Sequence, residues 1–169
     1  TAECTVTVTV PVGSVTLDKT SLSLAVGETA TLTATVKPDN ATDKNVAWTS
    51  SDESVAMVAS GKVTAVKPGK ATITAKCGDK IAECAVTVTV PVGSVTLDKT
   101  SLTLAVGETA QLAATVNPDN ATDKNMTWTS SDESVAKVAN GKVTAVKSGK
   151  ATITAKCGGK TAECTVTVY

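Results

Sequence analysis

The chain has 169 residues, in which 16 lysines balance 16 acidic residues and neither arginine nor histidine occurs. Zero net charge gives no field to attract nucleic acid or anionic lipid, and without histidine the usual neutral-pH base and the commonest metal ligand are missing. No apolar run approaches the roughly 20 residues of a membrane-spanning helix. We therefore expect no enzymatic activity, no cofactor, no metal, no nucleic acid partner and no membrane insertion of this segment.

An eight-residue sequence, TAECTVTV, stands at 1–8 and again at 161–168, with a near copy at 81–88. A shift of 80 places residues 11–88 on 91–168 with 12 differences in 78 positions. Self-similarity at a fixed period is the signature of a repeated module. We interpret 1–10 as the last strand of a truncated preceding repeat, 11–90 as the first complete copy and 91–169 as the second, so that each copy's partners include its neighbouring repeats.

Within a copy, apolar residues alternate with polar ones, a period typical of half-buried strands, and glycine, proline and asparagine separate the alternating runs. Short strands with such frequent turns favour an antiparallel β-sandwich and an all-β fold. The first copy predicts seven or eight strands, at about 14–18, 21–25, 29–36, 45–50, 55–59, 62–66, 70–77 and 83–90.

The same alternation predicts which side chains point inward. Trp48 and Trp128 are the large rings of their copies, and we expect each to fill the centre between two sheets. Met57 becomes Lys137 and Thr31 becomes Gln111 in the second copy, which places these positions on the solvent face. The inward set of the first copy is Val15, Leu17, Leu22, Leu24, Leu32, Ala34, Val36, Val46, Trp48, Val55, Val58, Val63, Ala65, Ile73, Ala75, Val86 and Val88.

The five cysteines have a C-x6-C spacing in each copy, Cys77 with Cys84 and Cys157 with Cys164, while Cys4 has no such mate. Both thiols of a pair share the inward parity on adjacent strands joined by a tight loop. We predict two cross-strand disulfides and an unpaired thiol at Cys4. An oxidised pair indicates a location outside the cytoplasm. The alternatives are reduced, buried cysteines acting as small apolar residues, and a zinc site, for which two thiolates are too few.

The sequence around these features resembles the bacterial immunoglobulin-like domain, group 2. The matching stretches run from VTLDKTSLSLAVGETATLTATV through WTSSDESVA to GKATITAKCGDKIAECAVTV, and they recur 80 residues later. The resemblance implies two tandem immunoglobulin-like β-sandwiches of the kind repeated along bacterial and phage surface proteins, intimin- and invasin-like adhesins among them. It implies no catalytic motif.

Two functional hypotheses follow. The first is a structural spacer, or stalk, of a bacterial cell-surface or secreted protein, holding a distal adhesive or catalytic domain away from the surface. The short, proline-containing junction Pro91-Val92-Gly93-Ser94 favours it, because such a link is stiffer than a Gly/Ser tether. The second is an adhesion module that itself binds a glycan or a host or cell-surface protein, including display on a phage virion. Oxygen-rich loops at 38–45 and 50–54 leave calcium binding open, although Asp, Asn and Ser also serve turns.

Overall fold

The structure of the chain is a computed structural model that describes residues 2–169. The chain divides into two compact units, Thr1–Thr89 (unit 1) and Val90–Tyr169 (unit 2). All regular secondary structure in the described residues is β-strand, as predicted. Unit 1 contains β1 (Ser14–Leu17), β2 (Ser21–Ala25), β3 (Thr29–Thr31), β4 (Ala34–Lys37), β5 (Ala47–Ser50), β6 (Ala56–Ala59), β7 (Lys62–Ala65), β8 (Gly69–Cys77) and β9 (Lys80–Thr89). Unit 2 repeats them as β10 (Ser94–Leu97), β11 (Ser101–Leu104), β12 (Thr109–Gln111), β13 (Ala114–Asn117), β14 (Thr127–Ser130), β15 (Ala136–Ala139), β16 (Lys142–Ala145), β17 (Gly149–Cys157) and β18 (Lys160–Val168).

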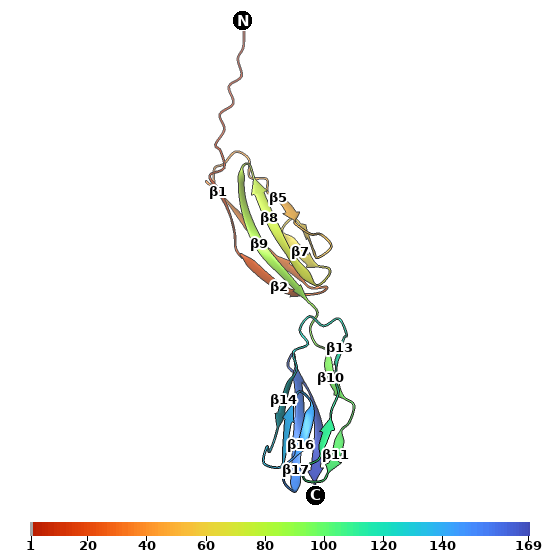
Figure 1. The fold of residues 1–169 in the computed structure, drawn as a ribbon. Coiled ribbons are helices and arrows are strands. Elements are labelled where there is room, and N and C mark those ends of the chain that lie inside the picture. The colour runs from red at the N-terminus through yellow and green to blue at the C-terminus, as the bar shows by residue number, and fades with distance from the viewer. Residues whose placement is uncertain (1) are drawn as a thin grey trace. The chain divides into compact units, whose positions relative to one another are not determined.

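Each unit is a sandwich built on one four-stranded sheet. In unit 1 its order is β2-β9-β8-β5, and the long hairpin β8–β9 forms its middle (Figure 1). The strands opposite it are β3-β7-β6 and the pair β1-β4. Unit 2 has the same arrangement, with β11-β18-β17-β14 as the larger sheet. All pairs within unit 1 are antiparallel except β2 with β9, which run parallel from Ser21 opposite Ala85.

The predicted strand at 29–36 is divided into two short strands that pair with different neighbours. β3 pairs with β7, whereas β4 pairs with β1. The break falls at Leu32 and Thr33, where the Leu32 N–H donates to Gly61 O at 2.8 Å. The periodicity of the sequence does not reveal this break, because the alternation of Thr with apolar residues continues across it.

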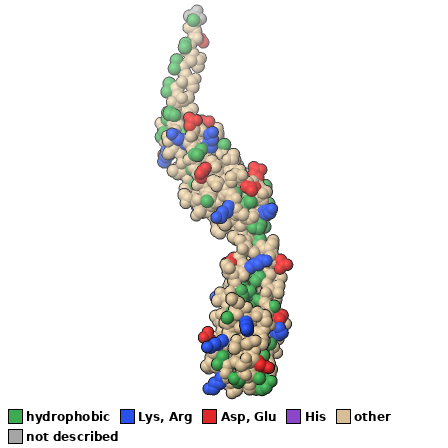
Figure 2. All heavy atoms as spheres, in the orientation of Figure 1, with side chains coloured by type: hydrophobic (Ala, Val, Ile, Leu, Met, Phe, Trp, Pro, Cys, Tyr) green, Lys and Arg blue, Asp and Glu red, His purple; other side chains and the backbone are tan. Residues whose placement is uncertain are grey.

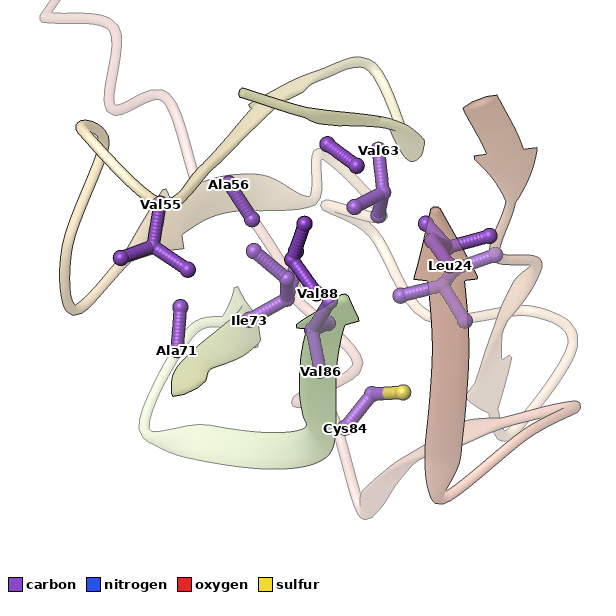
Figure 3. Close-up of a cluster of buried hydrophobic side chains, with 11 residues drawn as sticks. Leu24, Val55, Ala56, Val63, Ala71, Ile73, Cys84, Val86 and Val88 are labelled. Carbon is purple, nitrogen blue, oxygen red and sulfur yellow. The ribbon is translucent and has the colours of Figure 1, made fainter. Parts of the chain in front are cut away.

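The core of unit 1 lies between the larger sheet and the opposite strands, and its main cluster is shown in Figure 3. Ile73 from β8 and Val86 and Val88 from β9 meet Val63 and Leu24 there. Burying such aliphatic side chains contributes about 1.5–3 kcal/mol each. A second cluster with Val15, Ala75 and Cys77 fills the other end of the sandwich. Every member of the predicted inward set is buried or partly buried.

Two neighbouring residues, Val55 and Ala56, are both buried and therefore depart from strict alternation. Their N–H groups both donate to Asp52 O, at 3.2 and 3.0 Å. This turn replaces the start of the strand predicted at 55–59, and β6 begins only at Ala56. A turn can bury consecutive side chains, whereas a pleated strand places them on opposite faces.

The segment 2–13 belongs to no strand in this structure. Residues 1–8 recur with the same letters in β18 and with nearly the same letters in β9, where each strand has partners on both sides. A strand forms only where its backbone N–H and C=O groups find a neighbouring ladder. The assignment of 1–10 to a preceding repeat therefore stays a prediction.

Candidate functional site

A hollow of unit 2 lies beside Trp128 and has a volume of about 450 Å³. Trp128 is on β14, and the loop between β13 and β14 contributes Asp119, Lys124 and Met126. Asn140, from the turn between β15 and β16, completes this set. An aromatic ring beside one carboxylate, one ammonium group and one amide is a combination that suits a polar ligand with an apolar face.

Trp48 and Trp128 are only partly buried, and each packs against both core clusters of its unit. The tight turn at Gly61 brings the chain close to Trp48. Gly61 has φ +83, and an added Cβ would lie 2.5 Å from Leu32 O and 3.2 Å from the Trp48 ring. The ring therefore rests against a turn that only glycine can make.

Three of the 12 differences between the two copies lie at this hollow or next to it. Met126 and Asn140 line it, and the first copy has Val46 and Ser60 at these positions. Gln111, which replaces Thr31, donates from Nε2 to Leu112 O at 3.0 Å and to Asn140 O at 3.2 Å. The hollow was not predicted from the sequence. The signal that could have located it is this set of substitutions, which are far apart in the chain and adjacent in space.

The acidic loops use their carboxylates for local structure. Asp52 Oδ1 accepts hydrogen bonds from Ser54 N–H at 2.9 Å and Ser54 Oγ–H at 2.6 Å, and these bonds hold the pKa of Asp52 below its usual value. Asp43 Oδ1 accepts from Asn45 N–H at 2.9 Å. Within residues 2–169, no group of three or more His, Cys, Asp or Glu side chains is arranged to hold a metal ion. These contacts are those of turns and short loops.

The prediction of Cys77–Cys84 and Cys157–Cys164 disulfides is wrong in this structure, in which all five cysteines are free. In the β8–β9 hairpin, Cys77 lies opposite Lys80, whereas Cys84 lies opposite Ile73. The two thiols thus share a face but are four residues apart along the ladder, about 13 Å at 3.3 Å per residue. A disulfide requires Cα atoms within about 7 Å. Cys157 and Cys164 have the same register, with Cys164 opposite Ile153.

The four cysteines of the two complete copies are buried and behave as small apolar side chains. Cys77 and Cys84 are 1% and 0% exposed and belong to different core clusters. The Cys77 thiol lies 3.6 Å from Asp43 O, which it can reach as a weak donor. Burial raises the pKa of the Cys84 and Cys164 thiols. Cys4 differs from them because it is exposed.

The surface carries lysine and acidic side chains interspersed on both units, as the visible face in Figure 2 shows. The ion pairs are short local ones, for example Lys37 Nζ to Asp39 at 2.8 Å. No helix among the described residues has the length and apolar character needed to cross a membrane. On the face shown in Figure 2, charges of both signs are mixed.

A family model, the bacterial Ig-like domain (group 2), matches residues 11–90 and 91–166. The chain is also similar to an uncharacterised protein of Clostridium acetobutylicum, 44% identical over 147 residues that cover 84% of this chain and 15% of that protein. It is 41% identical over 170 residues to an Ig-like virion protein of Serratia phage KSP90, covering 94% of this chain and 66% of the relative. An alpha-L-arabinofuranosidase of Bifidobacterium longum subsp. longum is 60% identical over 70 residues, 40% of this chain and 7% of the enzyme. The chain thus spans less than two thirds of each of these relatives.

Among solved structures, the N-terminal four Ig domains of Dscam1 isoform 9.44 superpose with a TM-score of 0.50 at 19% identity, covering 94% of this chain and 46% of that one. The S-layer protein rSbsC(31-844) gives a TM-score of 0.45 at 24% identity over 95% of this chain and 28% of its own. At such identities the likeness to Dscam1 concerns the fold alone.

Proposed function

Because this chain belongs to the bacterial Ig-like domain (group 2) family, we propose that it is a non-catalytic spacer of a bacterial cell-surface or secreted protein. In this role the two units hold a distal adhesive or catalytic domain away from the surface. The observation that carries the proposal is that each unit closes its own core from its own strands. A module that folds within its own 80 residues can be added or removed without changing its neighbours.

The relatives support a role that is independent of any one chemistry. Segments similar to this chain occur in a virion protein and, over 7% of its length, in an arabinofuranosidase. A module attached to proteins with such different activities is better explained by a shared mechanical task than by a shared substrate.

The spacer proposal is tested by changing the number of copies. Deleting residues 11–90 shortens the chain by one unit. Inserting a second copy of residues 91–168, joined to Pro91 by a Thr-Val pair like Thr89-Val90, lengthens it by one unit. We expect the maximum dimension from small-angle X-ray scattering to change by a similar increment in the two variants. A maximum dimension that stays constant when a unit is added would contradict the spacer role.

The hollow beside Trp128 favours a second candidate function, an adhesion module that binds a glycan or a host or cell-surface protein. Its support is the partly buried ring with Lys124, Asp119 and Asn140 around it. A glycan array probed with the full chain tests this candidate. The test variants are Lys124→Ala and Met126→Val, the latter giving the hollow the residue of the first copy, and we expect both to weaken binding. Met57→Lys, on the exposed surface of unit 1, is the control that should leave binding unchanged. Binding that neither Lys124→Ala nor Met126→Val changes would place the ligand elsewhere.

A further inference from the structure

One carboxylate is paired in unit 1 and unpaired in unit 2. In unit 1, Lys37 Nζ lies 2.8 Å from Asp39 Oδ1, and this hydrogen bond is the main cause that holds the pKa of Asp39 below its usual value. The corresponding residues of unit 2 are Asn117 and Asp119. Asparagine carries no charge, and within residues 2–169 Asp119 forms no ion pair. The carboxylate of Asp119 is therefore open to a ligand.

Asp119 lines the hollow beside Trp128 together with Lys124 and Asn140. Among the described residues, Lys124 forms no ion pair either. An ionised carboxylate only accepts hydrogen bonds, an ammonium group only donates them, and an amide does both. A ligand that satisfies all three groups must both donate and accept at neighbouring positions. Adjacent hydroxyl groups have this property, whereas a charged ligand group is repelled by one of the two charges.

The rest of the hollow is apolar. Trp128 and Met126 are partly buried, and the buried side chains of Leu112 and Val116 also line it. The C–H groups of a pyranose ring form an apolar face that can pack on an aromatic ring, while the hydroxyl groups project from the ring edge. The volume of about 450 Å³ is within the range of small-ligand sites, roughly 300–1,000 Å³. The hollow thus matches a sugar ring in size and in both of its surfaces.

Unit 2 differs from unit 1 in ways that add groups for such a ligand. Asn140 provides an amide where unit 1 has Ser60. Met126 provides a longer and more adaptable apolar side chain in place of Val46. Asn117, a fourth difference beside the hollow, removes the lysine that pairs with the carboxylate in unit 1.

We propose that the hollow beside Trp128 binds a pyranose residue of an uncharged glycan. Adjacent hydroxyl groups of the sugar bond to Asp119 and Lys124, and its apolar face packs against the Trp128 ring. The inference rests on the adhesion candidate proposed above, for which it names the ligand class and the unit that binds it. Unit 1 binds the same sugar more weakly, because Asp39 is already paired with Lys37.

The test uses the intact chain, with the methyl glycosides of glucose, galactose and mannose as probes. Each is titrated while the indole N–H signals of Trp48 and Trp128 are followed by NMR, so that unit 1 serves as an internal control. We expect at least one glycoside to shift the Trp128 signal to saturation, and the Trp48 signal to respond only at higher concentration. Equal responses of the two signals, or no shift of the Trp128 signal by any of the three, would overturn the proposal.

Charged sugars test the requirement for a neutral ligand. Glucuronic acid and glucosamine differ from glucose by one carboxylate or one ammonium group. Both should bind more weakly than the best neutral glycoside, because the hollow contains a charge of each sign. Tighter binding of either charged sugar than of every neutral glycoside would contradict the assigned ligand class.

Three variants test the role of the unpaired carboxylate. Asp119→Asn keeps the shape of the side chain and should weaken binding roughly tenfold, as expected for the loss of a hydrogen bond to a charged group. Asn117→Lys supplies the lysine of unit 1 and should weaken binding roughly two- to fivefold, because an exposed ion pair competes for the carboxylate. Asn117→Gln is the matched neutral control and should leave the affinity unchanged. If Asp119→Asn and Asn117→Lys bind as tightly as this control, the carboxylate has no role in the site.

The outcomes separate this inference from the adhesion candidate itself. Binding to a glycan array that persists in the Asp119→Asn chain would support adhesion through another surface and overturn the site proposed here. A peptide that shifts the Trp128 signal when no neutral glycoside does would likewise leave adhesion in place and overturn the glycan class. Melting curves of each variant check the fold, which should be retained because unit 1 already has lysine at the position of Asn117.

Discussion

Asp18 and Thr33 are joined by two hydrogen bonds: Thr33 N–H donates to Asp18 Oδ1 at 2.8 Å, and Asp18 N–H donates to Thr33 O at 3.0 Å. The pair lies just beyond the end of β1 and at the break between β3 and β4. Asp98 and Ala113 repeat it in unit 2 at 2.8 and 3.0 Å. The contact joins the aspartate carboxylate to the backbone of the other residue. The second copy therefore keeps it, although alanine (Ala113) stands there in place of Thr33. A side-chain acceptor here satisfies an N–H that the broken ladder leaves free.

This pairing predicts a loss of stability in acid. Hydrogen bonds from Lys19 and from the Thr33 backbone hold the pKa of Asp18 below its usual value, and Asp98 is affected in the same way by Lys99 and Ala113. The stabilisation is therefore complete above the unfolded pKa of about 3.9 and disappears as pH falls through the lower folded pKa.

We expect the double variant Asp18→Asn, Asp98→Asn to melt below the wild type at pH 7 and to approach it at low pH. Melting curves followed by circular dichroism across this pH range measure the difference. Asp79→Gly is the control, because the second copy already has Gly159 there. A melting difference that does not shrink in acid would argue against the assigned role of the carboxylate.

The register of the hairpins predicts that reducing agent has no effect on stability. With Cys84 opposite Ile73, neither copy can form its C-x6-C disulfide, so Tm with and without dithiothreitol should agree. Alkylation of the native protein should modify Cys4 rapidly and the four buried thiols only after denaturation. An intact mass lower by two or four hydrogens than the fully reduced chain would show that the register is different.

Because Trp48 is only partly buried, we predict that truncating its side chain causes a large but not maximal loss of stability. Trp48→Ala should cost about 3 kcal/mol, the lower end of the range for core aromatic residues, because part of the ring already faces solvent. Met57→Lys is the control: Met57 is 49% exposed, and Lys137 occupies the position in unit 2, so the change should stay within about 0.5 kcal/mol. Urea denaturation of both variants measures the difference, and equal stabilities would refute the packing assigned to the ring.

The turns before β7 and β16 have Ser60 and Asn140 at the same position, and we predict that exchanging these two residues changes the stability of each unit. Ser60 has φ 50 and Asn140 has φ 48, the left-handed region that asparagine tolerates better than serine. Ser60→Asn should therefore raise the stability of unit 1 by about 0.5 kcal/mol, and Asn140→Ser should lower that of unit 2 by a similar amount. Thermal unfolding of the two variants checks the opposite signs. The bond from Gln111 Nε2 ends on the backbone O of Asn140, which serine keeps, so it is the same in both variants of unit 2. Changes of the same sign would therefore contradict the assigned preference of asparagine for this turn.

The failed cysteine prediction shows where reasoning from parity stops. Parity correctly placed Cys77 and Cys84 on the inward face, because side-chain direction depends only on neighbours along one strand. Whether two residues lie opposite each other depends on the turn. The two-residue turn at Gly78 and Asp79 sets Cys77 opposite Lys80, and each further pair moves one residue outward on both strands. The predicted strands ended at residue 77 and began again at 83, whereas β9 begins at Lys80, so the register of Cys84 with Ile73 was not predicted.

The amino-acid sequence alone determined the repeat, the strand period and the inward face, since these are properties of residues close together in the chain. Tertiary structure decided the break at Leu32, the parallel pairing of β2 with β9 and the hollow beside Trp128, because each joins segments that are distant in sequence. Local preferences cannot choose between such long-range partners; the choice is made by which pairing closes the core and leaves no buried N–H or C=O without a hydrogen bond.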